Sequence, residues 1–157
     1  GPRSAPRSAG VLLYRRSTGD LEVLLGHPGG PFYTKKDNGV WTIPKGELEP
    51  GEDEFAAAVR EFTEEMGSAP PEVTPLPLGE AKQSGRKVNV VWALAGDFDV
   101  SSLRSNTFPM EWPPRSGRLQ QFEEIDRVAW FDLDVARRKL RPAQLPFLDR
   151  LVSALGG

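Results

Sequence analysis

Short apolar runs separated by turn residues mark the first part of the chain. Residues 11–14 and 21–25 are β-type runs, and the polar segment 17–20 between them has turn chemistry. The pattern therefore predicts a hairpin. A polar, glycine-rich loop is expected over residues 27–39, followed by a third short strand over residues 40–43 that the next proline ends.

The strongest helical periodicity covers residues 53–66. Gly67 follows as a left-handed C-cap, and two consecutive prolines shortly afterwards prevent continuation of the helix. At about 100° per residue, the large apolar side chains share one stripe, which we expect to face the core. Its members are Phe55, Val59, Phe62 and Met66.

The second half of the chain mixes strand and helix patterns. Residues 99–119 have the composition of a long loop, which in a compact domain is usually functional or disordered. Because strands and helices do not alternate regularly, we expect an α/β fold with a mixed sheet and helices on its faces. The predicted elements are strands over 73–78, 87–94 and 127–131 and helices over 132–140 and 144–155.

Composition narrows the class of protein. A length of 157 residues suits one domain. We expect a flexible N-terminal tail over residues 1–8 and a single domain over residues 9–157. The chain has no cysteine, which excludes disulfides, thiolate zinc sites and thiol nucleophiles. No apolar run approaches a membrane span, so we expect no membrane partner and a cytoplasmic protein, although a secreted protein without its signal would look the same. A net charge of −2 argues against a nucleic-acid polymer as partner but allows a small phosphorylated ligand held through a cation.

Acidic residues concentrate over residues 46–67, where eight carboxylates accompany a single base, Arg60. On the helical wheel Glu64 and Glu65 fall within about 60° of Glu61, beside the apolar stripe. Such crowding is unfavourable by itself, and a divalent cation that prefers hard oxygen ligands, Mg²⁺ or Mn²⁺, would reverse its cost. A solvated acidic face is the alternative interpretation of these three residues alone.

The carboxylate helix and the loop before it carry a spacing that resembles the Nudix box, the signature of Nudix hydrolases: Gly46-x5-Glu52-x7-Arg60-Glu61-Phe62-x-Glu64-Glu65-x-Gly67. Residues 41–46 also look like the segment that leads into the box. Phe62 fills the first aliphatic position, whereas Ser68 departs from the Ile, Leu or Val usual at the second. The resemblance covers about residues 8–155 and implies a Nudix-type α/β/α sandwich with a mixed β-sheet.

The resemblance implies a metal-dependent pyrophosphohydrolase that cleaves a diphosphate linkage in a nucleoside diphosphate-X substrate. Because the chain is short, we favour a (di)nucleoside polyphosphate or a nucleoside triphosphate over an NDP-sugar. A non-catalytic Nudix-fold nucleotide-binding module is a further alternative, which the intact set of glutamates disfavours. The resemblance also implies Mg²⁺ as cofactor, with Mn²⁺ as a substitute, and a monomer or homodimer that binds a small molecule.

Roles in the box follow residue by residue from the resemblance. Glu61 and Glu65 match the main metal ligands. Glu64 matches a further ligand or the base that activates water, so that all three belong to the expected catalytic set. The carbonyl of Gly46 is expected to complete the metal shell.

Two further pairs of residues receive roles. Glu52 and Arg60 match a pair that ties the loop to the helix, so we expect their role to be structural. Glu123 and Glu124 precede the last strand, where many Nudix enzymes place one more glutamate at the metal site or as a base. We favour Glu124 as a catalytic residue by a small margin, and a pair of surface carboxylates is the alternative.

Four residues outside the acidic helix are candidates for substrate binding. Lys45 precedes Gly46 and could reach a phosphate. Tyr33 and Trp112 lie in expected loops, where an exposed aromatic ring could stack on a base. His27, the only histidine, could face the site, although a packing role is favoured for it.

Overall fold

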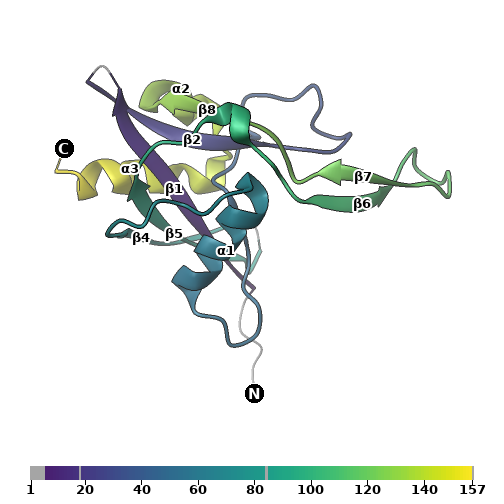
Figure 1. The fold of residues 1–157 in the computed structure, drawn as a ribbon, viewed down its shortest axis with the longest axis horizontal. Coiled ribbons are helices and arrows are strands. Elements are labelled where there is room, and N and C mark those ends of the chain that lie inside the picture. The colour runs from purple at the N-terminus through teal and green to yellow at the C-terminus, as the bar shows by residue number, and fades with distance from the viewer. Residues whose placement is uncertain (1–5, 18, 84, 157) are drawn as a thin grey trace.

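The computed structural model describes residues 6–17, 19–83 and 85–156 and is built around a six-stranded sheet with the order β4-β5-β1-β2-β8, with β3 pairing beside β2 on β1 (Figure 1). The strands of this sheet are β1 (Arg7–Ser17), β2 (Asp20–Pro28), β3 (Lys45–Glu47), β4 (Leu76–Lys82), β5 (Val88–Ala95) and β8 (Ile125–Asp132). The helices are α1 (Glu54–Met66), α2 (Leu133–Lys139) and α3 (Leu145–Ala154).

The sheet is mixed, as expected. β1 runs parallel to β5, and β1 and β2 form the predicted antiparallel hairpin, in which Ser17 pairs with Asp20. Thr18, in the predicted turn, lies outside the described residues. The remaining pairings, β1 with β3, β2 with β8 and β4 with β5, are antiparallel.

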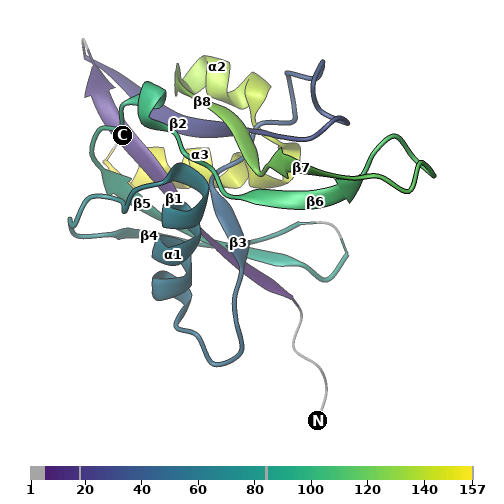
Figure 2. The same cartoon turned by 45° about the vertical axis from the view of Figure 1, so that its right-hand side comes forward.

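Strand alternation divides the core into two layers. Val11 and Leu13 on β1 belong to the cluster that packs under α1, whereas Leu12 between them belongs to the cluster under α2 and α3. Side chains of one strand point alternately to opposite faces of a sheet, so a continuous apolar run indicates burial on both faces. The expected α/β/α sandwich is confirmed, with α1 on one face of the sheet and α2 and α3 on the other (Figure 2).

Helix α1 matches its predicted limits closely. The Asp53 side chain accepts a hydrogen bond of 3.0 Å from the Ala56 N–H, which satisfies one free donor of the first turn. Gly67 adopts a left-handed conformation with φ of 89° and donates its N–H to the Thr63 carbonyl. Phe62 and Met66 of the predicted stripe are fully buried.

Two sequence predictions near the start of the chain need correction. Residues 40–43 form no strand ladder. Thr42 forms an isolated β-bridge to Gly26 and Trp41 one to Leu140, so the backbone hydrogen bonds of this segment go to two different parts of the chain. The third strand begins after Pro44 instead. Within the expected tail over 1–8, residues 1–5 lie outside the described residues, but Arg7 and Ser8 belong to β1 and pair with β5.

The long loop expected over 99–119 contains the first strand of a second, two-stranded sheet and ends where its other strand begins. β6 (Thr107–Glu111) and β7 (Leu119–Glu123) form an antiparallel hairpin that extends away from the sandwich (Figures 1 and 2). The prolines of this segment indicate a loop, yet Pro109 fits a strand whose outer edge has no ladder partner among the described residues. In the described part of the chain, no helix is long and apolar enough to cross a membrane.

Candidate functional site

Strand β3 and helix α1 bring the loop of the acidic motif against its glutamates. A Cβ atom on Gly46 would lie 2.0 Å from the carboxylate carbon of Glu61. No side chain fits in that space, so glycine allows the backbone to approach the carboxylate. The structure thus places residue 46 beside Glu61, as the resemblance implies for a ligand carbonyl.

Arg60 ties the loop to the helix. Its Nε and Nη2 atoms donate to the two carboxylate oxygens of Glu52 at 2.8 and 2.9 Å, a bidentate pair. Nη2 also donates to the Glu47 carbonyl at 3.2 Å. The bonds from Arg60 lower the pKa of Glu52 to about 2. This geometry agrees with the structural role expected for both residues.

The same arginine holds two of the candidate ligands. Nη1 of Arg60 donates to Glu61 at 2.9 Å and to Glu64 at 3.2 Å. The Glu61 side chain is 15% exposed, whereas that of Glu64 is 43% exposed. Burial, opposed by Arg60, raises the pKa of Glu61 above its ordinary value. Glu64 therefore lies at the rim, and Glu61 lies inside.

Glu65 is the most unusual carboxylate of the described chain. It is 9% exposed, and its Oε2 atom has no hydrogen-bond partner among the described residues. Burial, with the nearby charges of Glu61 and Glu124, raises the pKa of Glu65 to about 9. Without a cation this group is held in its neutral form at neutral pH.

Glu124 lies at the junction between β7 and β8. Its backbone N–H donates to the Asn106 carbonyl at 2.9 Å, and its carbonyl accepts from the Gly29 N–H at 3.0 Å. The residue is half-buried, and burial raises its pKa, whereas Glu123 is exposed on β7. The tertiary structure therefore brings Glu124, rather than Glu123, to the buried carboxylates of α1.

Glu65 and Glu124 line one cavity of about 220 Å³. Two basic side chains, Lys45 and Arg141, line the same cavity as these acidic residues. Burial, with the charge of Arg141 as a further cause, lowers the pKa of Lys45, while the charge of Glu65 opposes this. The polar lining residues are Thr42, Lys45, Glu65, Gln83, Glu124 and Arg141.

Sequence reasoning missed Arg141 and Gln83. Arg141 follows a run of basic residues on α2, and nothing in the sequence distinguishes it from its neighbours. Gln83 follows β4, at a hairpin end where a polar residue is ordinary. Only the packing of distant segments around the cavity identifies either residue.

His27 does not fit the expectation that it contacts substrate. Its side chain is fully buried, with Nδ1 2.8 Å from an Asp126 carboxylate oxygen and Nε2 2.7 Å from the Lys36 carbonyl. Both ring nitrogens are engaged by protein groups. The favoured alternative, a packing histidine, describes this residue: it ties the loop after β2 to β8.

The two aromatic candidates lie in different places. The Tyr33 ring centroid lies 5.5 Å from the Arg141 guanidinium carbon, next to the cavity wall. Trp112 lies beyond the end of β6, where its ring contacts Phe32 edge-on at 5.4 Å. Trp112 does not line the carboxylate cavity, so this position does not support a base-stacking role there.

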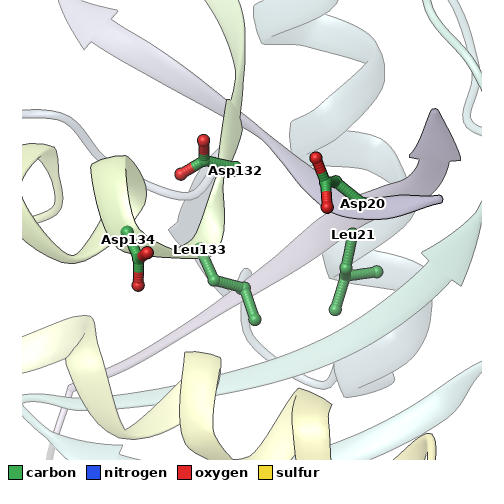
Figure 3. A pocket seen from close by; sticks show the side chains of 5 residues that line it. All are labelled: Asp20, Leu21, Asp132, Leu133 and Asp134. Carbon is green, nitrogen blue, oxygen red and sulfur yellow. The ribbon is translucent and has the colours of Figure 1, made fainter. Parts of the chain in front are cut away.

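Another acidic cavity, of about 300 Å³, lies where the β1–β2 turn meets the start of α2 (Figure 3). Its lining includes Asp20, Asp132 and Asp134. The Asp132 side chain already accepts a hydrogen bond of 2.9 Å from the Val135 N–H as the N-cap of α2. We therefore assign Asp132 a structural role and do not place the active site here.

The carboxylates of α1, of which Glu65 lines the cavity, fit a divalent cation by the chemistry of their donors. Glu65 offers a buried oxygen without a partner, and the Gly46 cradle brings backbone against Glu61. Hard carboxylate and carbonyl oxygens are the ligands that Mg²⁺ and Mn²⁺ prefer. Over the residues that the structure describes, no three acidic or imidazole groups already converge as a metal cage. Arg60 instead holds Glu61 and Glu64 through its own bonds.

Comparison with known proteins agrees with this geometry. A model of the NUDIX domain matches residues 5–151. The bis(5'-nucleosyl)-tetraphosphatase (asymmetrical) of Caenorhabditis elegans is 38% identical over 68 residues, which cover 43% of this chain and 45% of that protein. The match thus spans less than half of this curated relative.

Solved structures share the fold over nearly the whole chain. A C. elegans Ap4A hydrolase in a binary complex has a TM-score of 0.64 at 25% identity, covering 97% of this chain and 98% of that chain. The Nudix domain of Shewanella oneidensis NrtR, complexed with ADP ribose, has a TM-score of 0.63 at 18% identity, covering 98% and 90%. With the box geometry and a family model that matches most of its length, the chain belongs to the Nudix hydrolase family.

Proposed function

We propose that this protein is a pyrophosphohydrolase that cleaves a diphosphate linkage in a nucleoside diphosphate-X substrate, with Mg²⁺ as its cofactor and Mn²⁺ as a substitute. Nudix hydrolases generally need divalent metal ions. The observation that carries the proposal is the buried Glu65, whose free oxygen lies in the cavity region shared with Glu124. A carboxylate so desolvated is costly to ionise unless a cation accompanies it.

In this proposal Glu61, Glu65 and the Gly46 carbonyl hold the cation, and Glu64 at the rim is a further ligand. When bound, the cation supplies positive charge that offsets the anionic oxygens of the polyphosphate and makes water more acidic. Glu124 accepts the proton from the attacking water, because its raised pKa makes it a stronger base than an exposed glutamate.

Other residues orient the substrate. Lys45 lies in the cavity beside Glu65 and binds a phosphate oxygen of the substrate. Tyr33 contacts Arg141 at the cavity wall and borders the path of the attached nucleoside. Glu52 and Arg60 touch no substrate and keep the loop in register with α1.

A dinucleoside polyphosphate is the substrate class that we favour. The support is the likeness to a tetraphosphatase and to an Ap4A hydrolase, the latter covering almost all of both chains. ADP-ribose, a nucleoside diphosphate linked to a sugar, is the second candidate because the NrtR domain of the same fold was solved with it.

A substrate panel tests the proposal. Purified protein is incubated in Mg²⁺ with diadenosine tetraphosphate, a nucleoside triphosphate, ADP-ribose and an NDP-sugar, and the products are identified by mass spectrometry. We expect fastest turnover of diadenosine tetraphosphate, and incorporation of ¹⁸O from labelled water at one phosphorus. Absence of hydrolysis of every member, in both Mg²⁺ and Mn²⁺, would refute the proposal.

A further inference from the structure

Arg141 lies in the cavity of Glu65 and Glu124 without an assigned task. Among the residues that the structure describes, it forms no ion pair and no side-chain hydrogen bond. Other arginines nearby are engaged: Arg137 pairs with Asp149 at 2.7 Å, and Arg150 donates to the backbone carbonyls of Leu78 and Glu80. Among the described residues, the one interaction of the Arg141 side chain is with the ring of Tyr33, which leaves the guanidinium donors available to a ligand.

Backbone bonds fix where Arg141 lies. Its N–H donates to the Trp41 carbonyl at 2.9 Å, directly after the bridge between Leu140 and Trp41. Three residues later Gln144, which is fully buried, accepts the Ile43 N–H at 2.9 Å. The end of α2 is thereby fastened to the segment that leads into β3, and Arg141 is held near Lys45.

Lys45 and Arg141 are two cations that line the same cavity. The Lys45 ammonium lies 3.5 Å from the Gln83 side-chain oxygen, a neutral acceptor, and has no ion-pair partner within the described residues. Two like charges in a desolvated pocket repel each other, and an anion between them removes that cost. The two cations are therefore suited to bind a phosphate group.

The size of the cavity indicates which part of a substrate enters it. About 220 Å³ is smaller than the roughly 300–1,000 Å³ of pockets that enclose a drug-sized ligand. A chain of phosphates fits this space better than a nucleoside does. In this cavity Glu65 and Glu124 suit the diphosphate that is cleaved, and Lys45 and Arg141 suit a phosphate farther along the chain.

We propose that Arg141 and Lys45 form a phosphate subsite that binds a phosphate beyond the cleaved diphosphate, and that Arg141 thereby makes the enzyme selective for longer polyphosphate bridges. The inference rests on the proposed hydrolase function and adds a preference for the number of phosphates in the substrate bridge. The planar guanidinium can bind two phosphate oxygens at once, and it lies over the Tyr33 ring.

The test compares kcat/KM in Mg²⁺ for diadenosine substrates bridged by two, three, four or five phosphates. The variants are Arg141→Ala, Arg141→Lys and, as a matched control, Arg138→Ala, which removes an exposed arginine of the same region. We expect Arg141→Ala to lose about ten- to a hundredfold on the tetraphosphate and little on the diphosphate. Arg141→Lys should fall between, and Arg138→Ala should match the wild type.

Two outcomes separate the inference from the proposed function. Equal losses by Arg141→Ala on all four substrates, or no loss, would overturn the subsite while leaving the hydrolase intact. If the wild type cleaves none of them, the favoured dinucleoside polyphosphate substrate class fails, and a binding measurement tests the subsite instead. Calorimetric titration of inorganic tripolyphosphate in EDTA should then show Kd weakened about tenfold or more by Arg141→Ala and unchanged by Arg138→Ala. Equal affinities of the three proteins would refute it.

Discussion

The backbone of Gly46 and the carboxylate of Glu61 occupy adjoining space, so that a Cβ on residue 46 would lie 2.0 Å from the Glu61 carboxylate carbon. Gly46→Ala must therefore displace Glu61 or the β3 backbone. We expect turnover to fall at least about tenfold, because moving a metal ligand or catalytic group by about 1 Å from its working position strongly reduces the reaction rate. Steady-state kinetics beside a melting curve checks this. Wild-type activity in a folded Gly46→Ala protein would contradict the close approach.

Glu65→Gln tests the buried carboxylate. The amide keeps the shape of the side chain but removes the charge that would bind a cation, so turnover should fall by orders of magnitude. At neutral pH Glu65 is neutral in the folded metal-free protein but ionised in the unfolded chain, so Glu65→Gln removes the cost of taking up this proton on folding, and the melting temperature in EDTA should rise rather than fall. Activity and melting are measured on the same preparation. Turnover within a few-fold of the wild type would remove Glu65 from the metal site.

The neighbouring pair Glu123 and Glu124 offers a matched comparison. Glu124→Gln removes the proposed base from the cavity, and we expect a loss of about 10²- to 10⁴-fold in kcat. Glu123→Gln alters an exposed strand residue and should leave kcat unchanged. A pH profile of kcat completes the test, because loss of the base should remove its acidic limb. Equal effects of both changes would exclude the assignment.

Metal-free stability should depend on pH through Glu65. Its pKa is raised from 4.5 to about 9, so the folded state binds this proton more tightly than the unfolded state. The stabilisation is complete below about pH 4.5 and is lost as the pH rises towards about 9, by up to about 1.4 kcal/mol per pH unit. Urea unfolding in EDTA between pH 5 and 9 measures the slope. The slope difference between wild type and Glu65→Gln isolates this residue, and identical slopes would contradict the raised pKa.

Added metal should stabilise the folded protein. A ligand that binds only the folded state raises its stability by RT ln(1 + [L]/Kd), about 2.7 kcal/mol at a hundred times Kd. We expect titration with Mg²⁺ or Mn²⁺ to raise the melting temperature of the wild type, with a smaller rise for Glu65→Gln. A matched series with Glu72→Gln, an exposed carboxylate outside the motif, should follow the wild type. Melting temperatures independent of metal would argue against the site.

Most of the fold follows from local patterns. The limits of α1 were predictable because its cap, its apolar stripe and its terminal glycine all act within the helix. Strands β5 and β8 were found from short apolar runs. The β6–β7 hairpin was missed because its prolines resemble those of a loop, and because its pairing joins segments on either side of a turn. The segment 40–43 looked like a strand because apolar composition does not show how backbone bonds are shared.

The sequence by itself determined the acidic helix, and its resemblance to the Nudix box indicated the loop glycine and the Glu52–Arg60 pair. These groups lie on one helix and its adjoining loop, so their placement needs no help from distant parts of the chain. Only the tertiary structure decided that Glu124 and Arg141 join Glu65 in one cavity and that His27 is buried and does not line it. The physical reason is that burial and charge depend on which remote segments pack together, and those contacts leave no periodic signal along the chain.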